Sequence, residues 1–284
     1  LLEWVAIRSG ASIIPFSRLN AFLEAHPNYP ATVPFRRRAE EALISEKKSP
    51  AAIRAFFHGQ RPASPAGRVA MAMALKDEGR VEEANALIRQ VWRQDHLGQP
   101  LEKIVLAAFD EVLGRDDHRL RAERYLFREN AGAALRNAAR VSADYVVLAR
   151  ARLASAKARR PIAPKLIAAV PASMKSDISF AFLLAQQARR EDKAADAAKA
   201  LTNVPRDPAL LGDGDEWWIE RRLIARKLLD AGEAEKAYEV AAAHGAEDTP
   251  ERIDAEWHAG FIALRFRNDA ARALGHFDAA AAQA

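Results

Sequence analysis

A turn residue followed five positions later by alanine recurs along this chain. Gly79 precedes Ala84 and Gly232 precedes Ala237 at this offset. The same offset joins Asp192 to Ala197 and Asn268 to Ala273. Gly114 is a further predicted turn. The 78 residues from Gly114 to Asp192 correspond to two repeats, and the other turns lie about 35 to 40 residues apart. Two helices of about 12 to 15 residues with two short turns use that length, so the period predicts stacked helix pairs.

Apolar residues spaced three and four apart fill most of the chain, and alternation typical of strands is rare. Alanine occupies 63 of the 284 positions, and a small side chain just after each turn lets two helices approach closely. The sequence therefore predicts an all-α fold, a right-handed superhelix of antiparallel helix pairs like a tetratricopeptide solenoid. We expect one domain over residues 1–284. Residues 1–50 are a candidate separate packing unit, because prolines interrupt them at positions 15, 27, 30 and 34.

Helix starts are marked by capping residues and proline. Ser49-Pro50 and Ser64-Pro65 each predict the beginning of a helix. The longest loop is expected over residues 207–215, where two glycines alternate with aspartates. Asp215 is expected to cap the helix that contains Trp217, and this loop lacks the ligand spacing of an EF-hand calcium site.

The overall charge excludes several classes of function. The chain has 43 basic and 38 acidic residues, a net charge of +5 and mixed signs along its length, which is unlike a dedicated nucleic-acid binder. It contains no cysteine, so disulfides, thiolate zinc sites and cysteine nucleophiles are excluded. No apolar run reaches the roughly 18 residues of a transmembrane span.

Motifs for catalysis and for cofactors are missing from the sequence. The seven histidines form no i, i+4 pair, and neither a P-loop nor a dinucleotide-binding glycine motif occurs. Adjacent carboxylates, such as those of Glu82 and Glu83, point about 100° apart on a helix, so they do not form an acid and nucleophile pair. We expect no cofactor, no metal ion and no catalytic residue in this chain.

The most concentrated aromatic and basic cluster is the candidate ligand surface: Trp217, Trp218, Arg221 and Arg222. Adjacent helical residues point about 100° apart, so one indole can be buried while the other faces a ligand. Packing of both indoles in the core is the alternative that we favour. The arginines would then either pair with nearby acids or attract a polymer that carries carboxylates.

Several sequence stretches resemble the helical superhelix of soluble lytic murein transglycosylases. The most specific are residues 217–228 (WWIERRLIARKL), 237–245 (AYEVAAAHG) and 255–266 (AEWHAGFIALRF). Residues 22–43 (FLEAHPNYPATVPFRRRAEEAL) and 114–118 (GRDDH) agree in order. The resemblance covers nearly the whole chain and is looser between about 130 and 205.

The resemblance implies a non-catalytic part of a periplasmic enzyme that cleaves peptidoglycan glycan strands. In that family a lysozyme-like catalytic domain follows the superhelix, with its acid in a Glu-Ser motif and a Gly-Leu-Met-Gln segment beyond. Neither motif occurs here, so no catalytic residue is carried over. The expected partners are peptidoglycan and the parent's own catalytic domain, and the signal peptide is expected outside this chain. The alternative function is a tetratricopeptide-like scaffold for protein–protein interaction.

Overall fold

The computed structural model describes residues 2–9, 14–30 and 32–283, and every regular element among them is a helix. Leu1 and Ala284, the ends of the predicted domain, lie outside the described residues. The all-α prediction is confirmed, and neighbouring helices pack as pairs. The right-handed superhelix stays a prediction.

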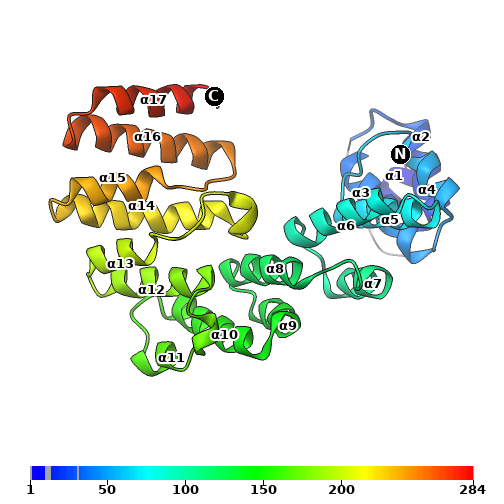
Figure 1. The fold of residues 1–284 in the computed structure, drawn as a ribbon. Coiled ribbons are helices and arrows are strands. Elements are labelled where there is room, and N and C mark those ends of the chain that lie inside the picture. Colours follow the sequence, from blue (N-terminus) through cyan, green and yellow to red (C-terminus); the bar gives the residue numbers. More distant parts are fainter. Residues whose placement is uncertain (1, 10–13, 31, 284) are drawn as a thin grey trace. The chain divides into compact units, whose positions relative to one another are not determined.

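The chain forms two compact units, residues 1–117 and 118–284. Figure 1 follows them in colour from blue to red. The boundary falls in the first turn of α8 rather than near residue 50. Residues 1–50 do not stand apart in the first unit, because α3 packs against α5. A single domain over 1–284 stays a prediction.

The first unit contains seven helices among its described residues and the start of an eighth. They are α1 (Leu2–Ser9), α2 (Phe16–Ala25), α3 (Thr32–Ser45), α4 (Pro50–Phe57), α5 (Pro65–Asp77), α6 (Val81–Gln94), α7 (Gln99–Phe109) and α8 (Arg115–Phe127). Helix α5 lies at the centre, in contact with α3, α4, α6 and α7. Two apolar clusters fill this unit, one around Phe35 and Phe57 and one around Trp92 and Phe109.

The predicted helix starts of α4 and α5 are confirmed. The hydroxyl of Ser49 accepts a hydrogen bond from the Ala52 backbone N–H, and Ser64 accepts one from Gly67. Ser64 also donates to the buried carboxylate of Glu40, which accepts a second bond from the Ala63 N–H at 2.8 Å. Glu40 thereby ties the loop before α5 to α3.

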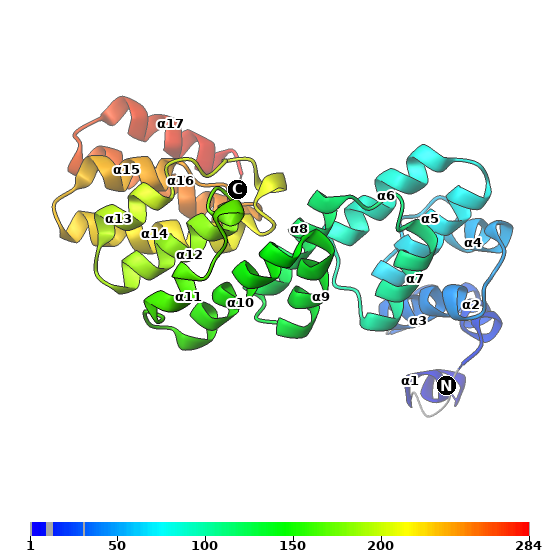
Figure 2. The ribbon, with the colours of Figure 1, turned by 60° about the horizontal axis from the view of Figure 1, so that its bottom comes forward.

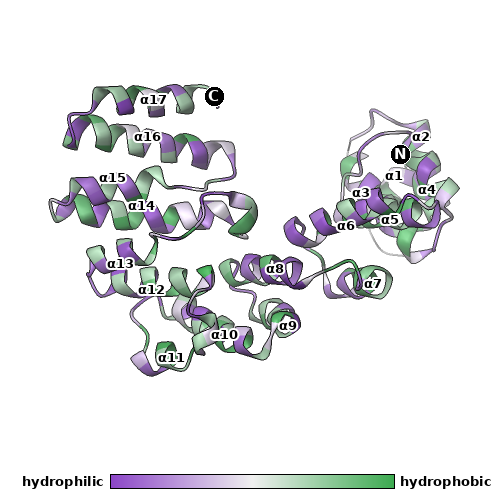
Figure 3. Cartoon of the chain, in the orientation of Figure 1, coloured by the Kyte–Doolittle hydropathy of each residue, from purple (hydrophilic) through white to green (hydrophobic). Residues whose placement is uncertain are grey.

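The second unit consists of helices that follow one another as packed pairs (Figures 1 and 2). They are α9 (Ala131–Val141), α10 (Ala143–Ala158), α11 (Pro164–Ala168), α12 (Ile178–Arg190), α13 (Ala194–Ala200), α14 (Gly214–Asp230), α15 (Ala234–Ala242), α16 (Thr249–Phe266) and α17 (Ala270–Ala281), with short 3₁₀ turns at Ala172–Met174 and Pro208–Leu210. The helices α10, α12, α14 and α16 contact one another in that order. Figure 3 shows hydrophilic and hydrophobic residues along these helices, as expected when one face is buried.

The predicted turns adopt the left-handed backbone conformation. The φ angles are +80° at Gly79, +76° at Gly232, 63° at Asp192 and 54° at Asn268. Gly114 differs, because it lies directly before α8 without a positive φ, and its N–H donates to Asp117. All five predicted turns thus lie between helices, and four of them are left-handed.

The alanines five positions after these four turns are all buried. Ala84, Ala197 and Ala237 are fully buried, and Ala273 is 1% exposed. Each lies in the second helix of a packed pair, namely α6, α13, α15 or α17. The predicted helix–helix contacts at these alanines are therefore confirmed.

A buried polar network crosses the second unit. The carboxylate of Glu123 on α8 accepts a hydrogen bond from the Tyr145 hydroxyl and lies 3.3 Å from the guanidinium of Arg152. Arg152 also donates to the Ser179 hydroxyl at 2.9 Å and lies over the Phe182 ring. Because all these groups are buried and paired, the network fixes α8, α10 and α12 relative to one another.

The prediction that Asp215 caps α14 is wrong. The cap is Asp213, whose extended backbone precedes the helix and whose side chain accepts from the Glu216 N–H. Gly214 is therefore the first residue of the helix. A Cβ atom at this position would come within 1.9 Å of the Gly245 carbonyl oxygen. Asp215 instead accepts hydrogen bonds from the backbone N–H groups of residues 247 and 248.

Asp215 also lies close to Asp248 and Glu251 near the start of α16, with one oxygen of each carboxylate within 4.8 Å of the others. Negative charge at a helix N-terminus is favourable, and this accounts for the acids there.

Among the described residues, no helix is both long enough and apolar enough to span a lipid bilayer.

We predict that Ala84→Leu lowers the free energy of unfolding by about 1 to 3 kcal/mol, because Ala84 is fully buried in the α5–α6 pair and a larger side chain overpacks that contact. Ala86→Leu is the matched control, since Ala86 is exposed on the same helix. Urea unfolding of both variants measures the difference. Equal stability of the two variants would contradict the role of the buried alanine.

Candidate ligand-binding face on α14 and α16

The two tryptophans of the predicted ligand surface lie in the core. Trp217 is fully buried, donates from Nε1 to the Leu211 carbonyl oxygen at 3.2 Å and meets the Phe182 ring edge-on. Trp218 is 1% exposed. Neither indole lies open to a ligand, so the structure has the core packing that the sequence favoured.

Asp254 on α16 connects Trp218 and Arg222 of α14. Its Oδ2 atom accepts a hydrogen bond from Trp218 Nε1 at 2.8 Å and one from Arg222 Nη1 at 2.6 Å. The positions 218 and 222 are one helical turn apart, so both side chains reach the neighbouring helix. Arg222 is half-buried and remains at the edge of this contact.

His258 lies one turn after Asp254 and extends the same face. Its Nδ1 atom is 2.8 Å from the Asp254 carbonyl oxygen, and its Nε2 atom is 3.2 Å from Nη2 of Arg226. The Nδ1 atom also lies 3.2 Å from a carboxylate oxygen of Asp254, so His258 contacts both the acid and Arg226.

An exposed aromatic pair lies beside these polar groups. Trp257 is 48% exposed, and its ring stacks on that of Phe261 with centroids 5.1 Å apart and planes 9° apart. The Trp257 ring also meets the His258 ring edge-on. We call Arg222, Arg226, Asp254, Trp257, His258 and Phe261 the α14–α16 face.

The electrostatics of this face are mildly positive. Arg222 is paired with Asp254, whereas Arg226 lies 3.2 Å from His258 and forms no ion pair within the described residues. Burial acts to raise the pKa of Asp254, but the hydrogen bonds from Trp218 and Arg222 outweigh it, so the pKa lies below the ordinary value. Asp254 is thus ionised at neutral pH and suited to hold the arginine rather than to give a proton.

A second cluster centres on Glu256, also on α16. Its carboxylate oxygens lie 3.1 Å from His244 Nε2 and 2.6 Å from His276 Nδ1. The other ring nitrogen of His276 is 3.0 Å from the Tyr238 hydroxyl. These half-buried groups join α15, α16 and α17. Burial lowers the pKa of His244 despite the neighbouring carboxylate.

Arg221 does not belong to the α14–α16 face. It is 2% exposed and points toward α15, where its Nη1 atom donates to the Val240 carbonyl oxygen. The structure therefore separates the four predicted site residues into two core indoles, one arginine on the α14–α16 face and one arginine beside α15.

Comparison of the chain with protein-family models, with curated protein sequences and with solved structures finds no match in any of the three. The resemblance to lytic transglycosylases thus stays a prediction.

Sequence reasoning missed Arg226, Asp254, Trp257, His258 and Phe261. A signal for them exists, because 222 and 226 are one turn apart on α14, while 254 and 258, and likewise 257 and 261, are one turn apart on α16. What the sequence does not show is that these two helices are neighbours.

The α14–α16 face offers an aromatic platform and the charge of Arg226 for binding, since Arg222 is paired with Asp254. Its one carboxylate is already occupied by Trp218 and Arg222. General acid catalysis needs a protonated acid near neutral pH, and the lowered pKa of Asp254 opposes this. The arrangement is suited to binding.

We predict that Asp254→Ala lowers the free energy of unfolding by about 1 to 3 kcal/mol, because the buried Trp218 N–H loses its acceptor. Asp254→Asn keeps an acceptor oxygen and should cost less. Denaturant unfolding followed by tryptophan fluorescence measures both variants. An equal loss in the two would show that the hydrogen bond does not matter.

We also predict that the protein loses stability as the pH falls below about 6.5, the ordinary pKa of histidine. The folded-state pKa of His244 is lowered, so in this range the unfolded chain binds a proton that the folded chain does not. The loss should continue until the pH passes the folded-state pKa. His244→Gln should reduce the change in melting temperature between pH 8 and pH 5.5, and an unchanged difference would contradict this assignment.

Proposed function

We propose that this chain is the non-catalytic helical domain of a periplasmic lytic transglycosylase, and that it binds the peptidoglycan strand that the parent enzyme cleaves. The sequence resemblance over residues 217–266 supports the family. The α14–α16 face supports the binding role. Under this proposal the lysozyme-like catalytic domain is a partner, and the chain alone cleaves no glycan because it lacks the catalytic acid.

The observation that carries the binding role is the exposed stack of Trp257 on Phe261, which meets the His258 ring that Arg226 contacts. A large exposed aromatic ring leaves apolar area in water, which a ligand with an apolar face can cover. Sugar rings have such faces in their C–H groups, and the peptide stems of peptidoglycan carry carboxylates. The guanidinium of Arg226, which forms no ion pair within the described residues, complements those carboxylates.

The order of helix contacts supports a superhelix as the form of this domain. In the second unit, the helices α10, α12, α14 and α16 pack on one another in sequence, and each is paired with a following or preceding helix. Such nearest-neighbour packing is typical of solenoid proteins. We propose the right-handed, tetratricopeptide-like arrangement for it.

A scaffold for protein–protein interaction is the second candidate function. The recurring turn with a buried alanine supports it, because tetratricopeptide-like pairs present their surfaces to peptides and proteins. This candidate predicts capture of proteins and no affinity for the cell wall.

We predict that the purified chain is retained by peptidoglycan sacculi and that Trp257→Ala lowers the retained fraction several-fold. Leu274→Ala is the matched control, since Leu274 is 61% exposed on α17 outside the α14–α16 face. Sedimentation with sacculi, followed by quantification of bound protein, measures retention. The same assay with immobilised lysate proteins tests the scaffold.

The dependence on salt tests the role of Arg226. Retention should weaken as salt shortens the screening length, which is about 3 Å at 1 M. Arg226→Ala should make retention weaker at low salt and less sensitive to salt. Retention that is absent, or that is equal in Trp257→Ala and Leu274→Ala, would refute binding through this face.

A further inference from the structure

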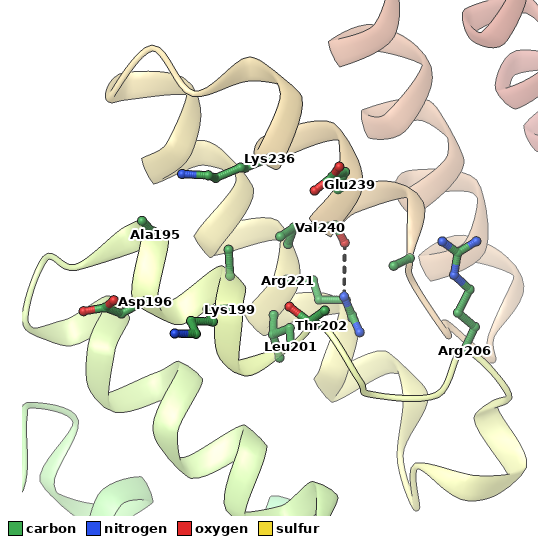
Figure 4. A pocket seen from close by; sticks show the side chains of 12 residues that line it. Ala195, Asp196, Lys199, Leu201, Thr202, Arg206, Arg221, Lys236, Glu239 and Val240 are labelled. Carbon is green, nitrogen blue, oxygen red and sulfur yellow. Dashed lines mark hydrogen bonds between the residues drawn. The ribbon is translucent and has the colours of Figure 1, made fainter.

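A groove opens between α13, α14 and α15 (Figure 4), and Asp254 does not line it. Its volume is about 690 Å³, which is within the range of roughly 300 to 1,000 Å³ for ligand sites. Small or apolar side chains form much of its wall, namely Ala195, Ala198, Leu201, Val240 and Ala243. The groove thus has room for a short peptide.

Arg221 is a buried cation that lines this groove. It is 2% exposed, and the one hydrogen bond that it forms within the described residues, from Nη1 to the Val240 carbonyl oxygen, is long at 3.4 Å. Its Nη2 atom is buried and has no hydrogen-bond partner among the described residues. No carboxylate in the described part of the chain forms an ion pair with it. Burial, together with the positive charge of Arg206, lowers its pKa to about 10.

An arginine in this state lacks its counterion. Burying a guanidinium is costly unless a negative group pairs with it, and a guanidinium has five N–H donors to satisfy. Three more cations line the groove, Lys199, Arg206 and Lys236. Lys236 is paired with Glu233, whereas Lys199 and Arg206 form no ion pair within the described residues. The exposed Thr202 lies between them in sequence and also lines the groove. Together these groups could bind an anion from outside the chain.

The acidic residues of the lining limit which anion fits. Asp196 on α13 and Glu239 on α15 also line the groove, as Figure 4 shows. Their charges repel a dianion such as phosphate more strongly than a single carboxylate. A planar carboxylate also matches the fork of one guanidinium. The alanine-rich wall suits small side chains next to that carboxylate.

We propose that this groove binds the free carboxylate end of a short peptide with small terminal residues, and that Arg221 is the residue that holds the carboxylate. Arg206 and Lys199 add attraction at the entrance, where both side chains are exposed. The inference does not depend on the function proposed above, because it uses other residues on another side of α14. It holds for a carboxylate on any peptide of this kind.

Calorimetric titration of the full chain with N-acetyl-Ala-Ala tests the proposal. The peptide with a free carboxylate should bind at least tenfold more tightly than its carboxamide. Arg221→Gln should reduce this preference to less than twofold, and Arg206→Ala should weaken binding of the acid a few-fold. Arg265→Ala is the charge-matched control, since Arg265 is exposed on α16 and does not line the groove, and it should bind like the unchanged protein.

Circular dichroism melting shows whether the Arg221→Gln variant folds. If that variant does not fold, Arg206→Ala provides a second test, because it changes an exposed loop residue. Equal binding of acid and amide would overturn the proposal. So would a preference that survives in Arg221→Gln, or one that Arg206→Ala and Arg265→Ala reduce equally. Inorganic phosphate that binds more tightly than the peptide acid would assign the groove to phosphate and overturn the peptide proposal. Failure of sacculus retention leaves these titrations unaffected.

Discussion

Four helix pairs share one contact: α5–α6, α12–α13, α14–α15 and α16–α17. In each, the second helix meets the first through a buried alanine in its opening turns. The chain reverses at a left-handed residue, so this part of the second helix faces the end of the first at short range. A methyl group fills that space without separating the backbones. Because successive pairs in the second unit pack through α10, α12, α14 and α16, the spacing within one pair also sets where the next pair can dock. The α14–α16 face and the groove at α15 both depend on this spacing.

Alanine contacts alone leave the register between helices weakly determined, since one methyl group resembles another. Single carboxylates between helices supply the missing specificity. Glu123 pairs with Tyr145 and Arg152 of α10, and Asp254 receives hydrogen bonds from Trp218 and Arg222 of α14. A shift of one residue would leave these buried groups unpaired at a cost of about 1 to 3 kcal/mol for each. The core is thus close-packed by alanine and aligned by polar pairs.

The sequence predicted the turns where the left-handed residue is glycine, asparagine or aspartate, because these residues adopt a positive φ at low cost. Between Gly114 and Asp192 it missed two left-handed turn residues, Glu129 and Arg159. There Glu129 is left-handed at φ 54°, and Ala134, five positions later, is fully buried. Glutamate gives no turn signal, so only the alanine marked this pair. The contact of Trp218 with Asp254 was likewise unpredictable, because it depends on which helices become neighbours across 36 residues.

Arg221 and Arg222 show how the helix divides a sequence motif between two sites. Adjacent residues on an α-helix point about 100° apart. Arg222 therefore reaches Asp254 on α16, where its charge is paired and half-buried, whereas Arg221 turns toward α15, where it is buried without a carboxylate. The carboxylate that pairs with Arg222 is that of Asp254 in this chain. A comparable acid for Arg221 is missing among the described residues, although Glu239 lies on the rim of the same groove. The unequal pairing of two neighbouring arginines distinguishes a structural ion pair from a site that needs an external anion.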